Sequence, residues 1–461
     1  MKSSAYVRGI GLFAVPLASV LAASACSQGS LTGGLAGLPH AAGIVRPASS
    51  SAYIQHVVII VQENRSFDNF FATFPGADGA TKGLMKTKSG DVWVQLTEGR
   101  LEFNDLSHEH ISFEKEFDHG QMDGFNLIER SLKRGVRVPA GEYAYRYVNP
   151  KYIKPYYDIA QQYVLADHMF TTQSSSSFTA HQDLIAGGTP VDGDNVIDFP
   201  VPASWGCDAK PGTVTSLITS TGKYRRAKGP FPCFTYATLR DLLDAKGLSW
   251  LYFTSVSRVY VWNAFDAIKV VRYGSEWQTN IIIPETGIFA AISNNNLPAV
   301  SWVIPDALNS DHPAYHTDTG PSWVASVVNA IGGSPYWQST AIVVLWDDWG
   351  GEYDNVPPPQ LDGQGLGMRV PMLVLSAYAR KTSPSQAGYI SHTQYEFGSV
   401  LRFIEDNWNL GRLGTSDTRA NSIIDCFDFS QSPRTFTPIS AKYPKSYFLH
   451  RPPSGLPVDT E

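Results

Sequence analysis

The most informative stretch of this chain reads TAIVVLWDDWGGEYDNVPPP, at residues 340–359. Residues 341–346 are apolar without a break and include three β-branched side chains, which predicts a strand buried on both faces of a parallel sheet. The run stops at Asp347 and Asp348, and Gly350 and Gly351 then allow a sharp turn. In open α/β sheets the binding crevice lies outside the carboxyl ends of the strands. Two carboxylates there suggest a cation site, although a capped turn gives the same pattern.

Two further apolar runs end in polar residues in the same way. They cover residues 54–61 (IQHVVIIV) and 299–304. The first leads to Glu63 and Asn64, and the second leads to Asp306 and His312. Because parallel strands present their carboxyl ends at one edge of a sheet, we expect these side chains to lie close to the two adjacent aspartates.

Alternation of strands and helices predicts the fold class. Besides the three runs above, strands are expected at residues 248–254 and 370–376, and helices at 156–166, 178–187, 236–245, 323–331 and 395–408. This order predicts an α/β fold with a mostly parallel central sheet flanked by helices. We expect one domain over residues 51–461, with a loop-rich excursion at about 188–240 where turn residues are frequent.

The N-terminus has the pattern of an export signal. Residues 1–25 combine Lys2 and Arg8, a short apolar segment and small residues before Cys26. Cleavage there predicts an exported protein, either a periplasmic lipoprotein held at the membrane through a lipidated Cys26 or a secreted protein without lipid. Residues 26–50 are rich in Gly, Ala, Ser and Pro, which is typical of a flexible tether.

Charge and cysteine content exclude some functions. The net charge is −6 and no basic cluster occurs, so nucleic acid is not an expected partner. In an exported protein, Cys207 and Cys233 are the preferred disulfide pair because they flank a Gly/Pro/Lys-rich loop. Cys426 is then a free, buried thiol. No two cysteines have C-x-x-C spacing, so we do not expect a cysteine-based zinc site.

A run of small hydroxyl residues ends at Ser177, directly before a predicted helix. Such a serine is either a helix cap or a nucleophile that uses the positive end of the helix. Glu, Asn and Asp oxygens suit one divalent ion, which could be Mg²⁺, Ca²⁺, Mn²⁺ or Zn²⁺. A metal at a serine hydroxyl favours the alkoxide, and nearby histidines can protonate a leaving group. Together these groups indicate phosphoryl transfer.

Several motifs resemble one known family. QENRSFDNFF, SSFTAHQ, SDHP, WDDWGGEYDNVPPP and RVPMLVLSAYAR, spread over residues 54–410, are similar to those of the bacterial phosphoesterase family, which includes non-specific phospholipases C and acid phosphatases. The resemblance implies an alkaline-phosphatase-like α/β fold with one metal ion. It also implies roles for single residues: Glu63, Asn64, Asp347 and Asp348 as metal ligands, Ser177 as the nucleophile, and His108, His312 and His181 as catalytic or phosphate-contacting residues.

Two positions depart from the family pattern, and two histidines compete for one role. Asn355 stands where relatives usually carry histidine and Phe397 where some of them do, and either change could alter an outer contact or an acid role. His110 competes with His108 for the family position. The remaining histidines that we assign to structure or surface are His119, His168 and His392.

The expected function is hydrolysis of phosphate esters through a phosphoserine intermediate, of the phospholipase C type acting on phosphatidylcholine-like diesters. A secreted acid phosphatase acting on monoesters is the alternative, and a non-catalytic surface lipoprotein that binds a phosphorylated ligand is an alternative of another class. The aromatic residues at 250–262 could form a lipid or choline-binding wall, but such residues more often lie in the core.

Overall fold

An eight-stranded sheet forms the centre of the computed structural model, which describes residues 50–132, 136–192, 195–255, 260–383 and 385–456. The strand order is β14-β13-β15-β1-β16-β17-β8-β18. Every neighbouring pair is parallel except the two pairs made by β17, so the sheet is mostly parallel. Its strands are β1 (His56–Gln62), β8 (Val164–Phe170), β13 (Trp250–Phe253), β14 (Ile281–Ile282), β15 (Val300–Val303), β16 (Thr340–Trp346), β17 (Arg369–Ser376) and β18 (Tyr389–Ser391).

The register between β1 and β16 explains why the predicted site residues meet. The two strands pair in parallel from His56 with Thr340 to Gln62 with Trp346, the last residue of each strand. Both strands are almost wholly buried, as their apolar runs predict. Because the two strands end side by side, the residues that follow them, 63–64 and 347–348, begin next to each other at the same edge of the sheet.

Helices flank the sheet in two groups. One group contains α4 (Ser177–Ala186), α5 (Leu239–Lys246) and α10 (Phe397–Trp408), which contact one another. The second contains α3 (Lys154–Gln162), α8 (Gly287–Ser293), α9 (Gly320–Gly332) and α11 (Lys445–His450). The α/β fold with a mostly parallel sheet flanked by helices is therefore confirmed.

Two predicted segments differ from the observed structure. The helix expected at 156–166 ends at Gln162, and β8 begins at Val164, because the residues that follow lie between β17 and β18 and complete the sheet. The excursion expected to be rich in loops at 188–240 contains a four-stranded antiparallel sheet. Its strands are β9 (Pro190–Asp192), β10 (Asn195–Val201), β11 (Val214–Ile218) and β12 (Tyr224–Arg225).

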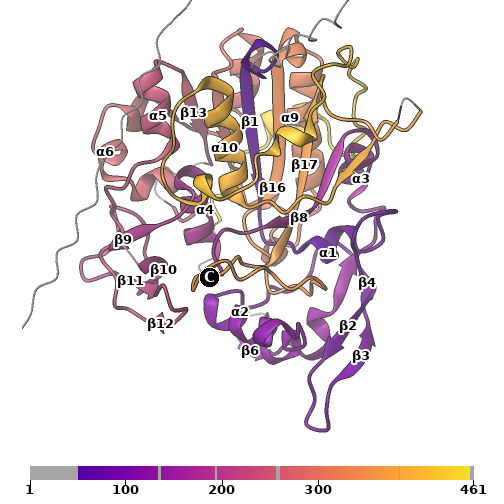
Figure 1. Ribbon diagram of the computed structural model, residues 1–461, viewed down its shortest axis with the longest axis vertical. Helices are drawn as coiled ribbons and strands as arrows, with labels where there is room; N and C mark the ends of the chain where they lie inside the picture. The colour runs from indigo at the N-terminus through magenta and orange to yellow at the C-terminus, as the bar shows by residue number, and fades with distance from the viewer. Residues whose placement is uncertain (1–49, 133–135, 193–194, 256–259, 384, 457–461) are drawn as a thin grey trace, which may run out of the picture. The chain divides into compact units, whose positions relative to one another are not determined.

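Small elements gather at the end of the main sheet where β1 leads into α1 (Phe67–Phe71). In Figure 1, β1 runs downward, and α2 (His110–Phe117), the β9–β12 sheet and the hairpin of β2 (Lys82–Met85) and β3 (Val92–Gln95) lie in the lower half of the picture. β2 and β3 pair in antiparallel direction from Lys82 with Gln95 to Met85 with Val92. Four more short strands belong to the same region: β4 (Thr97–Gly99), β7 (Arg146–Val148) and the pair β5 (Glu129–Leu132) with β6 (Val136–Pro139).

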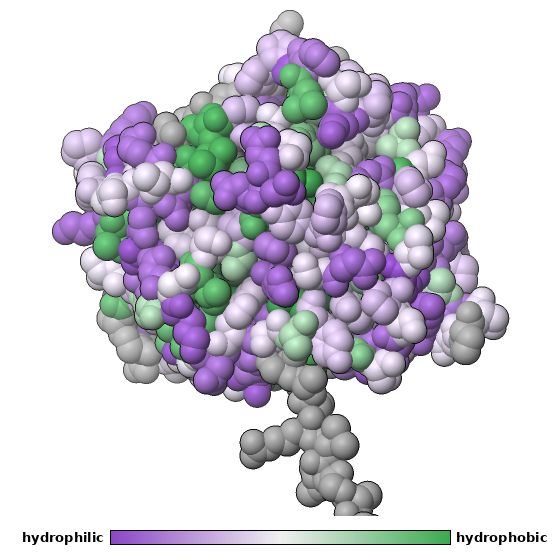
Figure 2. Space-filling view, turned by 90° about the horizontal axis from the view of Figure 1, so that it is seen from above, coloured by the Kyte–Doolittle hydropathy of each residue, from purple (hydrophilic) through white to green (hydrophobic). Residues whose placement is uncertain are grey.

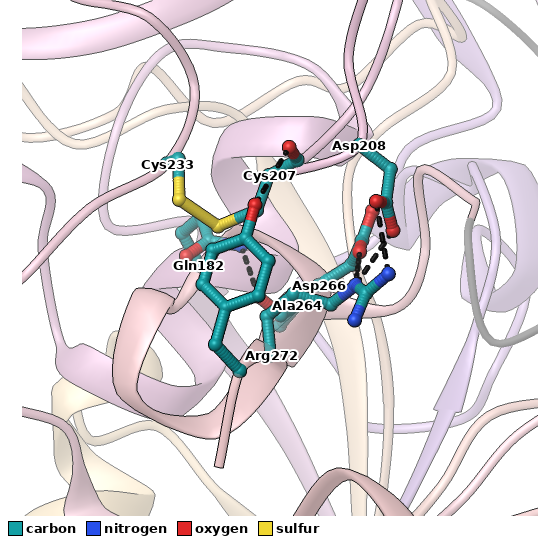
Figure 3. Close-up of a disulfide and its surroundings, with 8 residues drawn as sticks. Gln182, Cys207, Asp208, Cys233, Ala264, Asp266 and Arg272 are labelled. Atoms are coloured by element: carbon teal, nitrogen blue, oxygen red, sulfur yellow. Dashed lines mark hydrogen bonds and ion pairs between the residues drawn. A yellow bond between two sulfur atoms is a disulfide. The ribbon is translucent and has the colours of Figure 1, made fainter.

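The predicted disulfide between Cys207 and Cys233 is present, and Cys426 is a buried free thiol. Figure 3 shows the disulfide beside Asp266 and Arg272. Cys207 N donates to Asp266 O at 2.8 Å, and Gln182 Nε2 of α4 donates to Ala264 O at 2.9 Å in the same short segment. The disulfide-closed loop is therefore attached to the helix that begins at Ser177.

The predictions for the export signal, for Cys26 and for residues 26–49 lie outside the described residues. Among those that are described, no helix has the length and apolar character needed to cross a membrane. The face seen in Figure 2 carries small hydrophobic patches separated by hydrophilic side chains.

Candidate active site

The residues that follow β1, Glu63 and Asn64, contact those that follow β16, Asp347 and Asp348, at the edge of the sheet. Asn64 N donates to Asp347 Oδ1 at 3.0 Å, and Arg65 N donates to Asp348 O at 2.9 Å. Glu63, Asn64, Asp347 and Asp348 are all fully buried. Three carboxylates and one amide are thus packed together without contact to bulk water, which is costly unless a cation or protons compensate the charge.

The backbone and side chain of Asn64 are held in one orientation. Asn64 has φ +59°, in the left-handed region that asparagine tolerates better than most residues. Its Nδ2 lies 2.9 Å from His108 Nε2 and 3.5 Å from Asp348 Oδ2, so the amide nitrogen faces two acceptors. Asn64 Oδ1 is buried and makes no hydrogen bond within the described part of the chain. This oxygen is a candidate metal ligand.

Gly350 allows the loop after β16 to lie against Asn64. It has φ +63°, and a Cβ atom at this position would be 2.5 Å from Asn64 O. Gly350 N also donates to Asp348 Oδ1 at 2.8 Å. The Gly-Gly dipeptide therefore permits both the turn and the close approach of the two strand ends, as the sequence predicts.

Ser177 is the first residue of α4 and points at the acidic cluster. Its Oγ donates to Asp348 Oδ2 at 3.2 Å, and the side chain is fully buried. The preceding residue, Ser176, occupies the cap position but makes no side-chain capping bond. Ser177 is therefore not the helix cap, and its hydroxyl lies at the positive end of a ten-residue helix.

His181, one turn further along α4, contacts the same cluster. Its Nε2 is 2.9 Å from Glu63 Oε1 and 3.7 Å from Asp347 Oδ2. Burial lowers the pKa of His181 to about 4, against a smaller raising effect of Asp347. One donor atom from each of Glu63, His181 and Asp347 lies within 4.8 Å of the others. The geometry therefore places His181 among the possible metal ligands, a role that the sequence did not suggest.

His108 contacts Asn64 of the cluster, and His312 lies beside His108. His108 Nδ1 lies 2.7 Å from Leu106 O, which fixes the ring so that Nε2 faces Asn64. The rings of His108 and His312 are 6.4 Å apart. Ala314 N donates to His312 Nδ1 at 3.2 Å, so a neutral His312 carries its proton on Nε2. His108 is thus oriented as a partner of Asn64, and Nε2 of a neutral His312 is a hydrogen-bond donor.

Other candidates from the sequence lie elsewhere. Asp306 caps a short helix and binds Ser454, so it does not reach the cluster with the other strand-end acids. His110 lies against Ser174, which leaves the family position to His108. Asn355 Oδ1 accepts a hydrogen bond from Arg369 at 2.8 Å, and Phe397 is a core residue at the start of α10.

The aromatic residues at 250–262 are mostly core. Trp250, Tyr252 and Phe253 belong to β13 and are at most 2% exposed. Trp262 is also buried, but its ring stacks on His312 at 6.2 Å. Among the described residues of this group, Trp262 has a ring contact with a candidate site residue, and Tyr260 and Tyr315 are its neighbours.

The donor set fits a divalent cation. Asp347 Oδ2 and Asn64 Oδ1 are buried atoms without a hydrogen bond among the described residues. Burial, with the neighbouring Asp347 charge, raises the pKa of Asp348 to about 8. Carboxylate and amide oxygens with one imidazole nitrogen suit Mg²⁺, Ca²⁺, Mn²⁺ or Zn²⁺. A cation bound by Glu63, Asn64, Asp347 and Asp348 would balance charges that the protein itself leaves uncompensated.

The phosphoesterase family model matches residues 54–411, which cover most of the chain and all of the site. The chain belongs to the phosphoesterase family. Phospholipase C B from Mycobacterium tuberculosis is 24% identical, over 88% of this chain and 83% of that protein. Non-hemolytic phospholipase C from Pseudomonas aeruginosa is 24% identical, over 82% of this chain and 57% of its own length. Non-specific phospholipase C1 from Arabidopsis thaliana is 23% identical, over 85% and 74% of the two chains.

Solved structures similar to this phosphoesterase have low identity. A protein in the alkaline phosphatase superfamily from Vibrio parahaemolyticus is 10% identical with a TM-score of 0.37, over 81% of this chain and 72% of that one. The lipoteichoic acid synthase LtaP from Listeria monocytogenes is 8% identical with a TM-score of 0.37, over 81% and 78%. Family membership rests on the sequence match, and it makes this chain a hydrolase acting on phosphate esters.

Proposed function

We propose that this phosphoesterase hydrolyses phosphodiesters of the phosphatidylcholine type, as a phospholipase C, with Ser177 as the nucleophile. The observation that carries the proposal is the contact between Ser177 Oγ and Asp348 Oδ2 at the point where α4 meets the cluster of Glu63, Asn64 and Asp347. The names of the similar proteins from Mycobacterium, Pseudomonas and Arabidopsis favour the phospholipid class.

The chain's own groups supply the steps of a two-stage displacement. The Ser177 hydroxyl faces Asp348 Oδ2, which lies where its proton departs as Oγ attacks phosphorus. The bond from phosphorus to the diacylglycerol oxygen breaks, and His312 Nε2–H is the donor for that leaving oxygen. Water then hydrolyses the phosphocholine ester on Ser177. A divalent cation held by the oxygen cluster would supply charge neutralisation for the phosphate and for the serine alkoxide.

His108 has a positioning role in this proposal. Its Nε2 receives the Asn64 Nδ2–H, and its Nδ1–H donates to Leu106 O. Both ring nitrogens are thereby used in fixing the orientation of the Asn64 amide. The proton donor is therefore His312 and not His108.

Two adjacent serines offer a matched test. Ser177→Ala removes the proposed nucleophile, whereas Ser176→Ala removes a buried hydroxyl that makes no hydrogen bond among the described residues. We expect Ser177→Ala to lose phosphatidylcholine hydrolysis by about 10⁴-fold or more and Ser176→Ala to stay within threefold of wild type. Normal turnover by Ser177→Ala would remove the nucleophile assignment.

The same metal-replete samples distinguish the substrate class. Hydrolysis of phosphatidylcholine is measured beside that of p-nitrophenyl phosphate. Faster cleavage of the lipid supports the phospholipase C assignment, and faster cleavage of the monoester makes the protein a phosphatase. Absence of turnover on both substrates would favour a non-catalytic protein that binds phosphorylated ligands.

We further propose that the protein is exported and that residues 51–461 act as one domain. A disulfide between Cys207 and Cys233 is typical of an oxidising compartment, and the family match from residue 54 begins just after the predicted signal and tether. Separation of the expressed protein into cytoplasmic, periplasmic, membrane and medium fractions tests this location and the lipidation of Cys26.

A further inference from the structure

A second group of metal-competent side chains lies away from the catalytic cluster. Asp167 and His168 are adjacent on β8, and His392 follows β18. His168 Nδ1 is 2.8 Å from Asp167 Oδ1, and His392 Nδ1 is 2.8 Å from Asp167 Oδ2. One donor atom of each of the three residues lies within 4.8 Å of the others. The catalytic assignment uses none of these residues.

Backbone pairing holds the three side chains in place. β18 pairs in parallel with β8 up to Ser391 and Ala166, one residue before His392 and Asp167. Tyr395 N then donates to His168 O at 2.8 Å, which fixes the chain on the other side of His392. The two segments that carry the side chains are therefore fixed on both sides, which limits the entropy that binding a ligand would cost.

Asp78 completes the group from a third segment. Its backbone N donates to Asp167 Oδ2 at 2.9 Å, and its Oδ2 lies 3.4 Å from His168 Nε2. The buried Arg369 donates from Nη1 to both Asp78 O and Asp167 O, each at 2.8 Å. Asp78 Oδ2 therefore lies beside one nitrogen of His168 while the other faces Asp167, as in sites where a carboxylate orients a metal-ligating histidine.

We propose that Asp167, His168 and His392 form a second cation site, separate from the catalytic cluster, for a borderline divalent ion such as Zn²⁺. Two imidazole nitrogens and one carboxylate oxygen are ligands that zinc accepts and that Mg²⁺ and Ca²⁺ take less readily. Around zinc, with bonds of about 2.1 Å, neighbouring donors are roughly 3.4 Å apart. The Nδ1 atoms of the two histidines now lie 2.8 Å from the Asp167 oxygens, so each histidine must move back by about half an ångström to admit the ion.

The proposed site combines a buried carboxylate with two histidines that solvent can reach. The Asp167 side chain is fully buried, His168 is 25% exposed and His392 is 60% exposed. His392 also lines a surface cavity of about 540 Å³ beside Phe74 and Ile390. A cation can therefore enter from this side and keep a water molecule as a further ligand, while its charge neutralises a carboxylate that water does not reach.

Zinc binding by untagged, metal-stripped protein tests the site. Isothermal titration and elemental analysis after dialysis give the number of bound ions for wild type, His392→Ala, His119→Ala and Asp347→Asn. His392 is mostly exposed, so His392→Ala should fold, and an unchanged circular dichroism spectrum and melting temperature in the metal-free state check this. His119→Ala is the matched control because it removes an exposed histidine outside both groups.

We expect His392→Ala to bind one equivalent of Zn²⁺ fewer than wild type and His119→Ala to bind the same number. Asp347→Asn, which alters the catalytic cluster, should retain the equivalent that His392→Ala loses. Equal stoichiometry and affinity in wild type and His392→Ala would overturn the proposal and leave a hydrogen-bonded Asp–His cluster. If Zn²⁺ binding were lost only in Asp347→Asn, the ion would bind at the catalytic cluster and not at Asp167, His168 and His392, which would also overturn the proposal.

Discussion

Asn64 shows how one residue sets the geometry of the site. Its left-handed backbone follows directly on β1, and its side-chain nitrogen is fixed by His108 and Asp348. As a result, the amide has one orientation, and its buried oxygen makes no hydrogen bond among the described residues. The sequence identified this residue through a motif, but neither its φ value nor the orientation of its amide follows from a pattern of residue types.

Two substitutions of Asn64 separate the effect of backbone strain on stability from the effect of the side-chain oxygen on activity. Asn64→Ala places a side chain without a compensating hydrogen bond at φ +59°, which costs about 1 kcal/mol of stability, and it also removes Oδ1. Asn64→Gly removes the same oxygen without the strain. We expect both variants to lose about 100-fold or more in kcat/KM and only the alanine variant to unfold at lower denaturant concentration. Near-normal activity in the glycine variant would contradict the ligand role.

Glu352 gives a pH-dependent prediction. It is fully buried, accepts from Asn69 Nδ2 at 3.3 Å, and burial raises its pKa from 4.5 to about 8. The pKa of Glu352 is higher in the folded protein than in the unfolded chain. The protonated Glu352 carboxyl therefore contributes its full stabilisation below pH 4.5, and this contribution is lost as the pH rises toward 8. Relative to Glu352→Gln, wild type should therefore lose on the order of a few kcal/mol of unfolding free energy between pH 5 and pH 8.

Urea unfolding at a series of pH values measures this difference. Glu129→Gln is the control, since Glu129 is exposed, and its difference from wild type should stay constant with pH. A constant difference for Glu352→Gln as well would show that Glu352 is ionised in the folded protein.

At the scale of elements, the turn after β16 should be the least tolerant part of the site. Gly350→Ala brings a Cβ atom within 2.5 Å of Asn64 O, a backbone atom that cannot move aside without displacing the strand end. Gly411 has φ +94° with open space around its Cβ position, so Gly411→Ala adds backbone strain alone. We expect Gly411→Ala to lower stability by about 1 kcal/mol with normal activity, and Gly350→Ala to lose activity at least 100-fold. Equal effects of the two variants would show that the close approach is unimportant.

The elements that the sequence predicted best are those whose own pattern decides their structure. The unbroken apolar runs of β1 and β16 can only be buried strands, and the amphipathic segment of α10 lies where it was expected. In contrast, the segment VLADHMF of β8 contains Asp167 and His168 and follows a helix without a turn signal, so its pairing with β17 and β18 decides its conformation. The four-stranded sheet at β9–β12 was missed because its strands are short and bounded by frequent turns.

At the scale of the whole molecule, the disulfide connects an excursion to the rest of the domain. The bond between Cys207 and Cys233 closes a loop with a sequence separation of 26 residues. Removing it by Cys207→Ser with Cys233→Ser should lower the unfolding free energy by about 3 kcal/mol, chiefly through the unfolded state. Cys207 of this loop is hydrogen-bonded to Asp266, and the neighbouring Ala264 is hydrogen-bonded to α4, so the melting temperature should fall more than it does in Cys426→Ala. An unchanged melting temperature would show that the loop is ordered without the disulfide.

The arrangement of the site as a whole depends on contacts that no single segment contains. The ends of β1 and β16 meet because their register is exact to the last residue, and a shared sheet edge was predictable from two strand patterns. The contact of His181 with Glu63 was not predictable from sequence patterns, because it depends on how α4 packs against the sheet. The antiparallel direction of β17 depends equally on the path of the loop between 347 and 368.

The central claim is that Ser177 carries the phosphoryl group during turnover, and trapping that intermediate tests it most directly. Wild-type protein is mixed with phosphatidylcholine, quenched in acid within the first turnover and digested for peptide mass spectrometry. We expect a phosphocholine adduct on the peptide that contains Ser177, mapped by fragmentation to Ser177 and absent from Ser177→Ala. An adduct on another residue, or full activity of Ser177→Ala, would contradict it.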